Sequence, residues 1–311
     1  MRIAVTFPGQ GTQSPGMAAP WKGHPAWAIV EAAEDALGES LAPLVLDADS
    51  EALGRTRNAQ LAVLVTSLIA WEAARNELAG QPGLEIVAFA GHSLGQVTAL
   101  IAAGVLTLSD GVRFAARRAE LTQAAADANP GRMVALLGAT PEQAAEACTA
   151  AADAAWVAND NAPGQVVIAG TPDGVAAASE RAKQLGAKRA MALPVGGAFH
   201  TPLMAGARAG LIDQLATLRF AEPSAPIVSN ADATSHHDGE RWRARLADHP
   251  LLPVRWRESM LTLAAAPVAA DCFVEVGHGS MIAGVAKRTV PDIEVIGLAS
   301  PDDLQKLRPH A

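Results

Sequence analysis

The sequence feature that most constrains the fold is a short turn with glycine at both ends. It spans residues 91–95, reads Gly-His-Ser-Leu-Gly, and separates the apolar run 85–90 from the alanine-rich run 94–105. The first run has the composition of a buried strand and the second that of a helix. Glycines allow a sharp strand-to-helix corner, which would lift the Ser93 hydroxyl into a cleft. The pattern alone leaves open a structural turn or a phosphate-binding loop.

Apolar and helical runs alternate through most of the chain. Residues 60–78 have the pattern of a long helix that ends near Gly80 and Pro82. Because strands and helices alternate, we expect an α/β fold around a largely parallel sheet. The other strands of this sheet are predicted at 3–7, 226–229 and 272–276.

Residues 127–197 have a different pattern, in which short predicted strands and helices alternate within about 70 residues. Thr140 is suited to cap the first of these helices. The order strand, helix, strand, helix, strand predicts a small α+β subdomain inserted into the larger one. Its strands are predicted at 133–137, 165–169 and 190–195, and its helices at 141–155 and 174–185.

Composition and charge argue against several classes of protein. The 311 residues carry 32 acidic and 24 basic side chains, a net charge of −8, which disfavours general nucleic-acid binding but allows a local basic patch. No apolar stretch is long enough to span a bilayer, and the N-terminus lacks the apolar core of a signal peptide, so we expect a cytoplasmic protein. Cys148 and Cys272 have no metal-ligand spacing and are expected to be buried.

A serine hydroxyl is a weak nucleophile and needs a nearby base. His200 is a candidate, because it lies at a predicted strand-to-helix junction in Gly-Ala-Phe-His-Thr-Pro. His92 adjoins the serine, so its side chain should point away from the Ser93 hydroxyl. No metal site is predicted, because the His-His-Asp run at 236–238 has no further ligand at a motif spacing. The histidines expected to be solvated are His24, His236, His237 and His310.

Seven segments spread along nearly the whole chain carry a family resemblance. They are 7–13, 91–95, 118–123, 159–170, 197–200, 253–256 and 275–279. In content and order they resemble the malonyl-CoA:acyl carrier protein transacylase family, the acyltransferases of fatty-acid and polyketide synthesis. Any one segment is weakly specific, but the whole series is highly specific.

The resemblance implies both a fold and an activity. The fold is a large α/β-hydrolase-like subdomain, residues 1–126 and 198–311, with a small ferredoxin-like subdomain, residues 127–197, inserted in it. The activity is a ping-pong transfer of a malonyl group from malonyl-CoA to the phosphopantetheine thiol of an acyl carrier protein, through an ester on Ser93. The resemblance further implies a monomer that needs no metal and no bound cofactor.

Catalytic roles follow from the same resemblance. Ser93 corresponds to the nucleophile and His200 to its base. In the family, backbone carbonyls instead of a carboxylate orient this base, and one of them should come from the stretch around His249. Gln10 and the backbone N–H of Leu94 correspond to the oxyanion hole.

Substrate-binding roles are implied in the same way. Arg118 corresponds to the arginine that binds the free malonyl carboxylate, and its neighbour Arg117 would point about 100° away on a helix. Phe199 corresponds to the position that favours malonyl over branched acyl units. His92 and Asn161 are expected beside the substrate cleft.

The chain departs from the family pattern at three positions without losing a catalytic group. Gln96 stands in place of Glu, Ala119 in place of Gly, and His278 in place of Pro. Because carrier proteins are typically acidic, docking also requires a local basic rim. The candidates are Lys183, Lys188 and Arg189, followed by Lys287 and Arg288.

Three other interpretations stay open. A serine hydrolase or thioesterase also uses this turn, although α/β-hydrolases place an acidic residue between the serine and a late histidine. A non-catalytic scaffold of the same fold is disfavoured because the nucleophile, base, oxyanion and arginine positions are intact. Within the family, the acyl unit could differ, as in a trans-acting polyketide acyltransferase or a malonate decarboxylase subunit.

Overall fold

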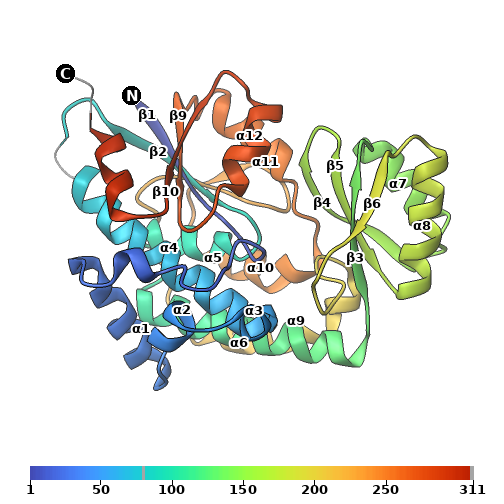
Figure 1. The fold of residues 1–311 in the computed structure, drawn as a ribbon, viewed down its shortest axis with the longest axis horizontal. Coiled ribbons are helices and arrows are strands. Elements are labelled where there is room, and N and C mark those ends of the chain that lie inside the picture. The colour runs from blue at the N-terminus through green and yellow to red at the C-terminus, as the bar shows by residue number, and fades with distance from the viewer. Residues whose placement is uncertain (79–80, 309–311) are drawn as a thin grey trace.

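Six strands form the central sheet of the computed structural model, which describes residues 1–78 and 81–308. They are β1 Arg2–Phe7, β2 Glu85–Gly91, β7 Ile227–Val228, β8 Ser235–His236, β9 Cys272–Val276 and β10 Glu294–Leu298. Their order across the sheet is β10-β9-β1-β2-β7-β8, and all neighbours are parallel except β7 and β8 (Figure 1). Because β1 and β2 lie at the centre, the loops after their carboxyl ends meet at one edge of the sheet.

Helices surround this sheet. The α-helices of the larger part are α1 Ala28–Leu37, α2 Ala42–Leu46, α3 Ser50–Gly54, α4 Thr56–Leu78, α5 Gly95–Ala102, α6 Leu108–Ala128, α9 Ala205–Ala216, α10 Trp242–Asp248, α11 Trp256–Ala264 and α12 Met281–Thr289. Short 3-10 helices span Ala19–Trp21, Pro25–Trp27, Pro202–Met204, His249–Leu251 and Pro301–Leu307.

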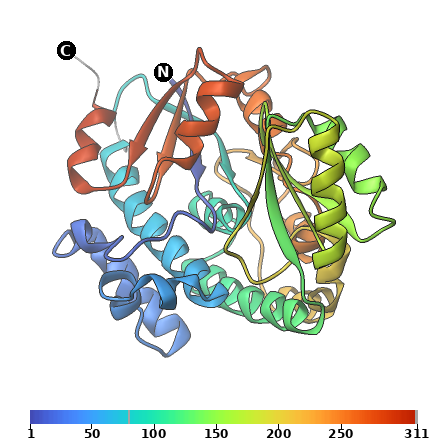
Figure 2. The same ribbon diagram turned by 45° about the vertical axis from the view of Figure 1, so that its right-hand side comes forward.

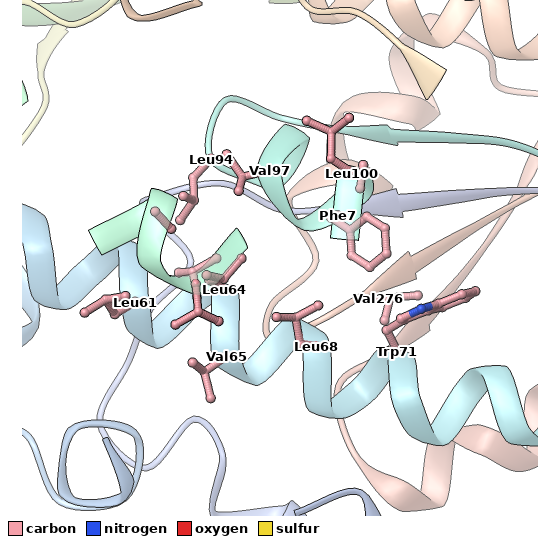
Figure 3. Packing of buried hydrophobic residues seen from close by; sticks show 14 of the residues in the cluster. Phe7, Leu61, Leu64, Val65, Leu68, Trp71, Leu94, Val97, Leu100 and Val276 are labelled. Atoms are coloured by element: carbon pink, nitrogen blue, oxygen red, sulfur yellow. The ribbon is translucent and has the colours of Figure 1, made fainter. Parts of the chain in front are cut away.

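Both faces of the central strands are buried, which explains their continuous apolar sequences. Side chains alternate along β1, so Ile3 and Phe7 face the cluster that contains α4 and α5, and Ala4 faces the cluster that contains α11 and α12. Trp71 of α4 meets the rings of Phe7 and Phe89 edge-on, at centroid distances of 6.2 and 5.5 Å. Figure 3 shows α4 running below β1 and α5, with its leucines and Trp71 turned toward them.

The middle of the chain forms a second, four-stranded antiparallel sheet. Its elements are β3 Arg132–Leu137, α7 Pro141–Thr149, β4 Ala155–Ala162, β5 Gln165–Gly170, α8 Pro172–Gln184 and β6 Arg189–Ala192. The strand order β4-β5-β3-β6, with the chain order β-α-β-β-α-β, is the ferredoxin-like arrangement. α7 and α8 cover the outer face, and the other face turns toward the larger sheet (Figure 2). The predicted fold class, a parallel sheet with a small inserted ferredoxin-like unit, is confirmed.

The strand and helix order predicted inside this small unit was wrong. The helix predicted at 141–155 ends at Thr149, because the chain leaves helical geometry at Ala152 and Asp153, whose φ values are 48° and 61°. The strand Ala155–Ala162 was therefore missed. Its Asn-Asp-Asn run hides it from a hydrophobic pattern, and two register shifts in its pairing with β5 interrupt the alternation of faces.

Other differences concern the ends of elements. The helix predicted at 94–105 spans Gly95–Ala102, the strand predicted at 190–195 ends at Ala192, and β10 was not predicted. α6 runs to Ala128, so the predicted subdomain boundary at 126–127 falls in its last turn. The predictions made for Gly80 and His310 lie outside the described residues.

Two expectations from composition can be compared directly with the structure. Cys148 and Cys272 are buried, as predicted, and burial raises the pKa of each thiol to about 12. Within residues 1–78 and 81–308, no helix combines the length and the apolar composition that a membrane span requires.

The sharp corner after β2 gives a testable stability difference between two glycines. A Cβ on Gly91 would lie 1.9 Å from the Gly95 carbonyl oxygen, whereas a Cβ on Gly284, inside α12, would meet nothing within 4 Å. Gly91→Ala should lower the free energy of unfolding by about 1–3 kcal/mol or more. Gly284→Ala should raise it by about 0.4–1 kcal/mol, because the unfolded chain loses freedom. Urea unfolding measures both, and a Gly91→Ala protein as stable as wild type would contradict this account of the corner.

Candidate active site

Ser93 lies at the corner between β2 and α5 in a backbone conformation that non-glycine residues rarely adopt. Its φ is 50°, and such a conformation costs of order 1–3 kcal/mol unless surrounding contacts hold it. Asn230 supplies two: its Oδ1 accepts from the Ser93 N–H at 2.8 Å, and its Nδ2 donates to the Gly91 carbonyl at 2.8 Å. Glycine is also required at Gly95, where a Cβ would lie 2.3 Å from the Phe7 carbonyl oxygen.

His200 contacts the serine directly. Its Nε2 lies 2.8 Å from Ser93 Oγ, and its Nδ1 lies 3.0 Å from the Leu252 carbonyl and 3.2 Å from the His249 carbonyl. Since carbonyl oxygens can only accept, Nδ1 carries the hydrogen, and the Nε2 lone pair faces the hydroxyl. This is the arrangement that a general base for serine requires. The carbonyl contact expected near His249 is present.

Burial keeps the His200 ring in its neutral form. Burial, together with the nearby Arg118 and His92, lowers the pKa of His200 to about 3. Burial likewise lowers the pKa values of His92 and His249. All three rings are therefore neutral at pH 7, so His200 is ready to accept a proton from the serine hydroxyl.

A cavity of about 180 Å³ opens beside the Ser93–His200 pair. One wall is the corner after β2, and another is formed by side chains of β3 and β5 in the small sheet. All eight residues with a predicted site role lie on its walls, although they come from segments far apart in the sequence. They are Gln10, His92, Ser93, Leu94, Arg118, Asn161, Phe199 and His200.

The start of α5 offers a hydrogen-bond donor to this cavity. The first amides of a helix have no partner inside it. In this corner the Gly95 N–H bonds to the His92 carbonyl at 2.9 Å and the Gln96 N–H to the Ser93 carbonyl at 3.0 Å. The Leu94 N–H precedes both, at the helix end where the backbone dipoles favour negative charge. Gln10, in the loop after β1, lines the same cavity.

Arg118 is a buried cation whose charge is not balanced by the cavity. The residue is 3% exposed, its Nη1 donates to Gln60 Oε1 at 2.6 Å, and its Nε has no partner among the described residues. Burial lowers its pKa to about 10, so it stays charged at neutral pH. Among the described residues that line the cavity, none is Asp or Glu. The neighbouring Arg117 is exposed and pairs with Glu120 at 3.3 Å.

Two further side chains shape the cavity. His92 Nε2 lies 2.8 Å from Asn161 Oδ1, which directs the His92 ring away from the Ser93 hydroxyl, as expected. This contact joins the corner after β2 to β4 of the small sheet. Phe199, directly before the base, is buried and lines the cavity.

The sequence analysis missed a set of supporting residues behind the corner. Besides its two contacts with the corner, Asn230 receives a hydrogen bond on Oδ1 from His249 Nε2 at 3.2 Å, and its own N–H donates to Gln96 Oε1 at 2.8 Å. Gln60 was not assigned a role either. Asn230 follows the predicted strand at 226–229, and a polar residue at the carboxyl end of a parallel strand is a usable signal. Gln60 carried no such signal, because its partner Arg118 lies on another helix.

The sequence matches that of a known family over almost its whole length. The model of the acyl transferase domain covers residues 5–308. The chain belongs to the acyl transferase domain family. A malonyl CoA-acyl carrier protein transacylase of Bacillus subtilis is 35% identical to this acyl transferase, over 98% of this chain and 95% of its own length.

Solved structures of malonyltransferases have nearly the same fold as this acyl transferase. An acyl carrier protein S-malonyltransferase from Vibrio cholerae has a TM-score of 0.92 and 34% identity, over 99% of this chain and 100% of that one. A malonyl-transacylase in complex with a type II PKS acyl-carrier protein has a TM-score of 0.92 and 32% identity, over 98% of both chains.

The positions at which the acyl transferase departs from the family pattern lie outside the Ser–His pair. Gln96 supports Asn230, as described above. Ala119 is fully buried on α6. His278 Nε2 lies 2.7 Å from Ser14 Oγ and so connects the loop before α12 to the loop after β1. None of the three displaces a side chain with a predicted catalytic role.

The buried histidines predict how the stability of the acyl transferase depends on pH. The pKa values of His92, His200 and His249 are lowered in the folded state, so below about pH 6.5 the unfolded chain binds protons that the folded chain does not. The free energy of unfolding should therefore fall as pH falls from 7.5 to 5.5, by up to about 1.4 kcal/mol per pH unit for each histidine.

Urea unfolding across this pH range measures the slope. His249→Gln, which keeps a donor for Asn230, should reduce the slope, whereas His237→Gln, on the surface, should not change it. Equal slopes in wild type and His249→Gln would show that His249 is not held neutral.

Proposed function

We propose that this acyl transferase takes a malonyl group from malonyl-CoA onto Ser93 and passes it to the phosphopantetheine thiol of an acyl carrier protein. One observation carries the proposal: a buried arginine, with no acidic residue on the described walls, shares a cavity with an activated serine. An acyl group that ends in a carboxylate would supply the missing negative charge. The names of the Bacillus subtilis and Vibrio cholerae relatives support the same activity.

The geometry supports a transfer in two symmetric halves. His200 Nε2 takes the proton from Ser93 Oγ as the oxygen attacks the thioester carbonyl. The oxyanion would be held by the Leu94 N–H and Gln10, and one such donor typically contributes about 10²–10³ in rate. The thioester C–S bond then breaks, and the coenzyme A sulfur leaves with the proton from His200.

The second half reverses the first. His200 takes the proton of the phosphopantetheine thiol, the sulfur attacks the malonyl ester, and Ser93 Oγ leaves and regains the proton. The scheme moves only acyl groups and protons, so we propose that it requires no metal and no bound redox cofactor. We further propose, from the family resemblance, that the chain acts as a monomer in the cytoplasm.

Hydrolysis would need water in place of the thiol, and the base is supported differently from the base of an α/β-hydrolase. In α/β-hydrolases an acidic residue orients the histidine. Here two backbone carbonyls, of His249 and Leu252, hold Nδ1 instead. This difference in the support of the base favours the acyl transferase interpretation over an α/β-hydrolase.

Replacing Arg118 tests whether the cavity binds an acyl group that ends in a carboxylate. Arg118→Ala should lower kcat/KM for malonyl-CoA by at least about tenfold to a hundredfold, because a charge-assisted bond contributes about 1.5–3 kcal/mol and 1.4 kcal/mol is one decade. Acetyl-CoA has no carboxylate and should be affected far less. Mass spectrometry of the Ser93 adduct, with an acyl-CoA panel, measures both.

Arg117→Ala is the matched control, because Arg117 is exposed and pairs with Glu120. It should leave both rates near wild type, and Ser93→Ala should abolish the adduct. Equal losses of acetyl and malonyl transfer in Arg118→Ala would mean that Arg118 does not bind the carboxylate.

The structure favours some of the candidate docking residues over others. Lys183 lies on α8, which covers the outer face of the small sheet, and pairs with Glu180 at 2.6 Å. Arg189 is exposed on β6 and in register with Leu137 of β3. Since Leu137 and Met133 share a face of β3 and Met133 lines the cavity, Arg189 points to the cavity side.

A second basic residue contacts a side chain of the cavity wall. Arg288 of α12 donates to Oε1 of Gln165, which is one of the cavity-lining residues. Gln165, Leu137 and Arg189 are in register across β5, β3 and β6. Arg189 and Arg288 therefore both lie near the same end of the cavity face of the small sheet. This favours them over Lys183 as contacts for an acidic carrier protein.

Reversing both charges should weaken docking selectively. The double variant Arg189→Glu and Arg288→Glu should raise KM for the carrier protein by about tenfold or more, because rim charges steer association. Self-acylation from malonyl-CoA should fall less. Lys183→Glu, on the outer face, is the matched control and should leave KM unchanged. Equal losses in both half-reactions would place carrier docking elsewhere.

A further inference from the structure

The residue that holds Arg118 in place is neutral. Gln60 of α4 is 1% exposed, lines the cavity, and accepts from Arg118 Nη1 through Oε1 at 2.6 Å. A buried guanidinium is more commonly held by a carboxylate, which would match its charge as well as its geometry. A glutamine provides the geometry without the charge.

We propose that Gln60 determines acyl specificity: its neutral amide orients Arg118 without cancelling its charge, which reserves that charge for the carboxylate of the acyl group. This inference rests on the proposed malonyl transfer and names a residue of the same site. Gln60 acts through Arg118, so it is a positioning residue. Its effect on specificity comes from the charge that it lacks.

The isosteric carboxylate would reverse this effect. With Gln60→Glu, Arg118 would form a buried ion pair inside the protein, and the cavity would lose its net positive charge. A malonyl carboxylate would then leave water for a site that already holds a carboxylate, which is unfavourable. An acetyl group carries no charge to desolvate, so its transfer would be spared.

The charge of Arg118 also reaches the base, which gives a second readout. The titratable and charged groups around His200 are Arg118 from α6, His92 from the corner after β2, and His249 from the 3-10 helix that precedes Leu252. Of these, Arg118 is the charged group at neutral pH, and it opposes protonation of His200. A carboxylate that balances the charge of Arg118, as in Gln60→Glu, should therefore raise the pKa of His200. The acid limb of the pH profile of kcat/KM should then move to higher pH.

The experiment compares wild type with three variants of the full chain. Gln60→Glu adds a charge beside Arg118, and Gln60→Leu removes the acceptor without adding a charge. Gln96→Glu, the matched control, adds the same charge at a second buried glutamine, which bonds to the Asn230 N–H instead of Arg118. For each, kcat/KM of Ser93 acylation is measured by mass with malonyl-CoA and acetyl-CoA between about pH 3 and pH 8, a range that includes the acid limb set by His200.

Gln60→Glu should lower the malonyl-to-acetyl ratio of kcat/KM by at least about a hundredfold. It should also shift the acid limb to higher pH. Gln96→Glu should change the ratio by less than about fivefold, whatever its effect on absolute rates. Gln60→Leu, which removes the support of Arg118 but leaves its charge free, should lower the ratio by about tenfold or less. A purely structural role of Gln60 would slow both substrates together and leave the pH limb in place.

Two results would overturn the inference. One is a folded Gln60→Glu protein with the wild-type ratio. The other is a loss of the ratio in Gln60→Leu as large as that expected for Gln60→Glu, which stays decisive even if Gln60→Glu does not fold. Failure of the proposed function itself is distinguishable, because wild type would then form no malonyl adduct on Ser93.

Discussion

The close backbone approach at the corner between β2 and α5 is the constraint on which the rest of the site depends. A Cβ on Gly91 or on Gly95 would lie 1.9 or 2.3 Å from a backbone oxygen, so only glycine lets the strand turn directly into the helix. That turn imposes the left-handed conformation on Ser93. It also directs the Ser93 hydroxyl toward His200 and the His92 ring toward β4. These two adjacent residues therefore contact different walls of the same cavity.

A single buried amide connects the nucleophile with the support of the base. Asn230 Oδ1 accepts from the Ser93 N–H and from His249 Nε2, while the His249 carbonyl accepts from His200 Nδ1. Ser93 and His200 are thus both connected to the Asn230 side chain, Ser93 directly and His200 through His249. The distance between Ser93 and His200 therefore does not depend on two independent loops. Every group in this chain of contacts is neutral at pH 7, which is consistent with a base whose Nδ1 is held by two backbone carbonyls.

Sequence patterns predicted the parts of the molecule where burial dictates composition. β1, β2 and β9 were predicted to within one residue, because strands buried on both faces have continuous apolar sequences. β4 was missed since its Asn159–Asn161 run is polar. Asn161 contacts His92 and Asp160 pairs with Arg257, so this strand carries polar contacts in place of an apolar pattern. The eight residues assigned to the site share one cavity, but Asn230 and Gln60 were assigned no role. Their contacts reach Ser93 and Arg118 across 137 and 58 positions of sequence, which no local pattern records.

The burial of position 118 also explains why the cation in the cavity is an arginine. Burial lowers the pKa of Arg118 to about 10, and the guanidinium still remains charged at neutral pH because it starts from 12.5. A lysine has an ordinary pKa of about 10.4. A comparable lowering would bring that pKa close to neutral pH, so a fraction of the lysine side chains would lose their charge. Arginine further presents several donors in one plane, so a neutral acceptor can hold one N–H while others stay directed at a ligand. A permanent charge and a planar set of donors are therefore both needed for a cavity that stays cationic while it is buried.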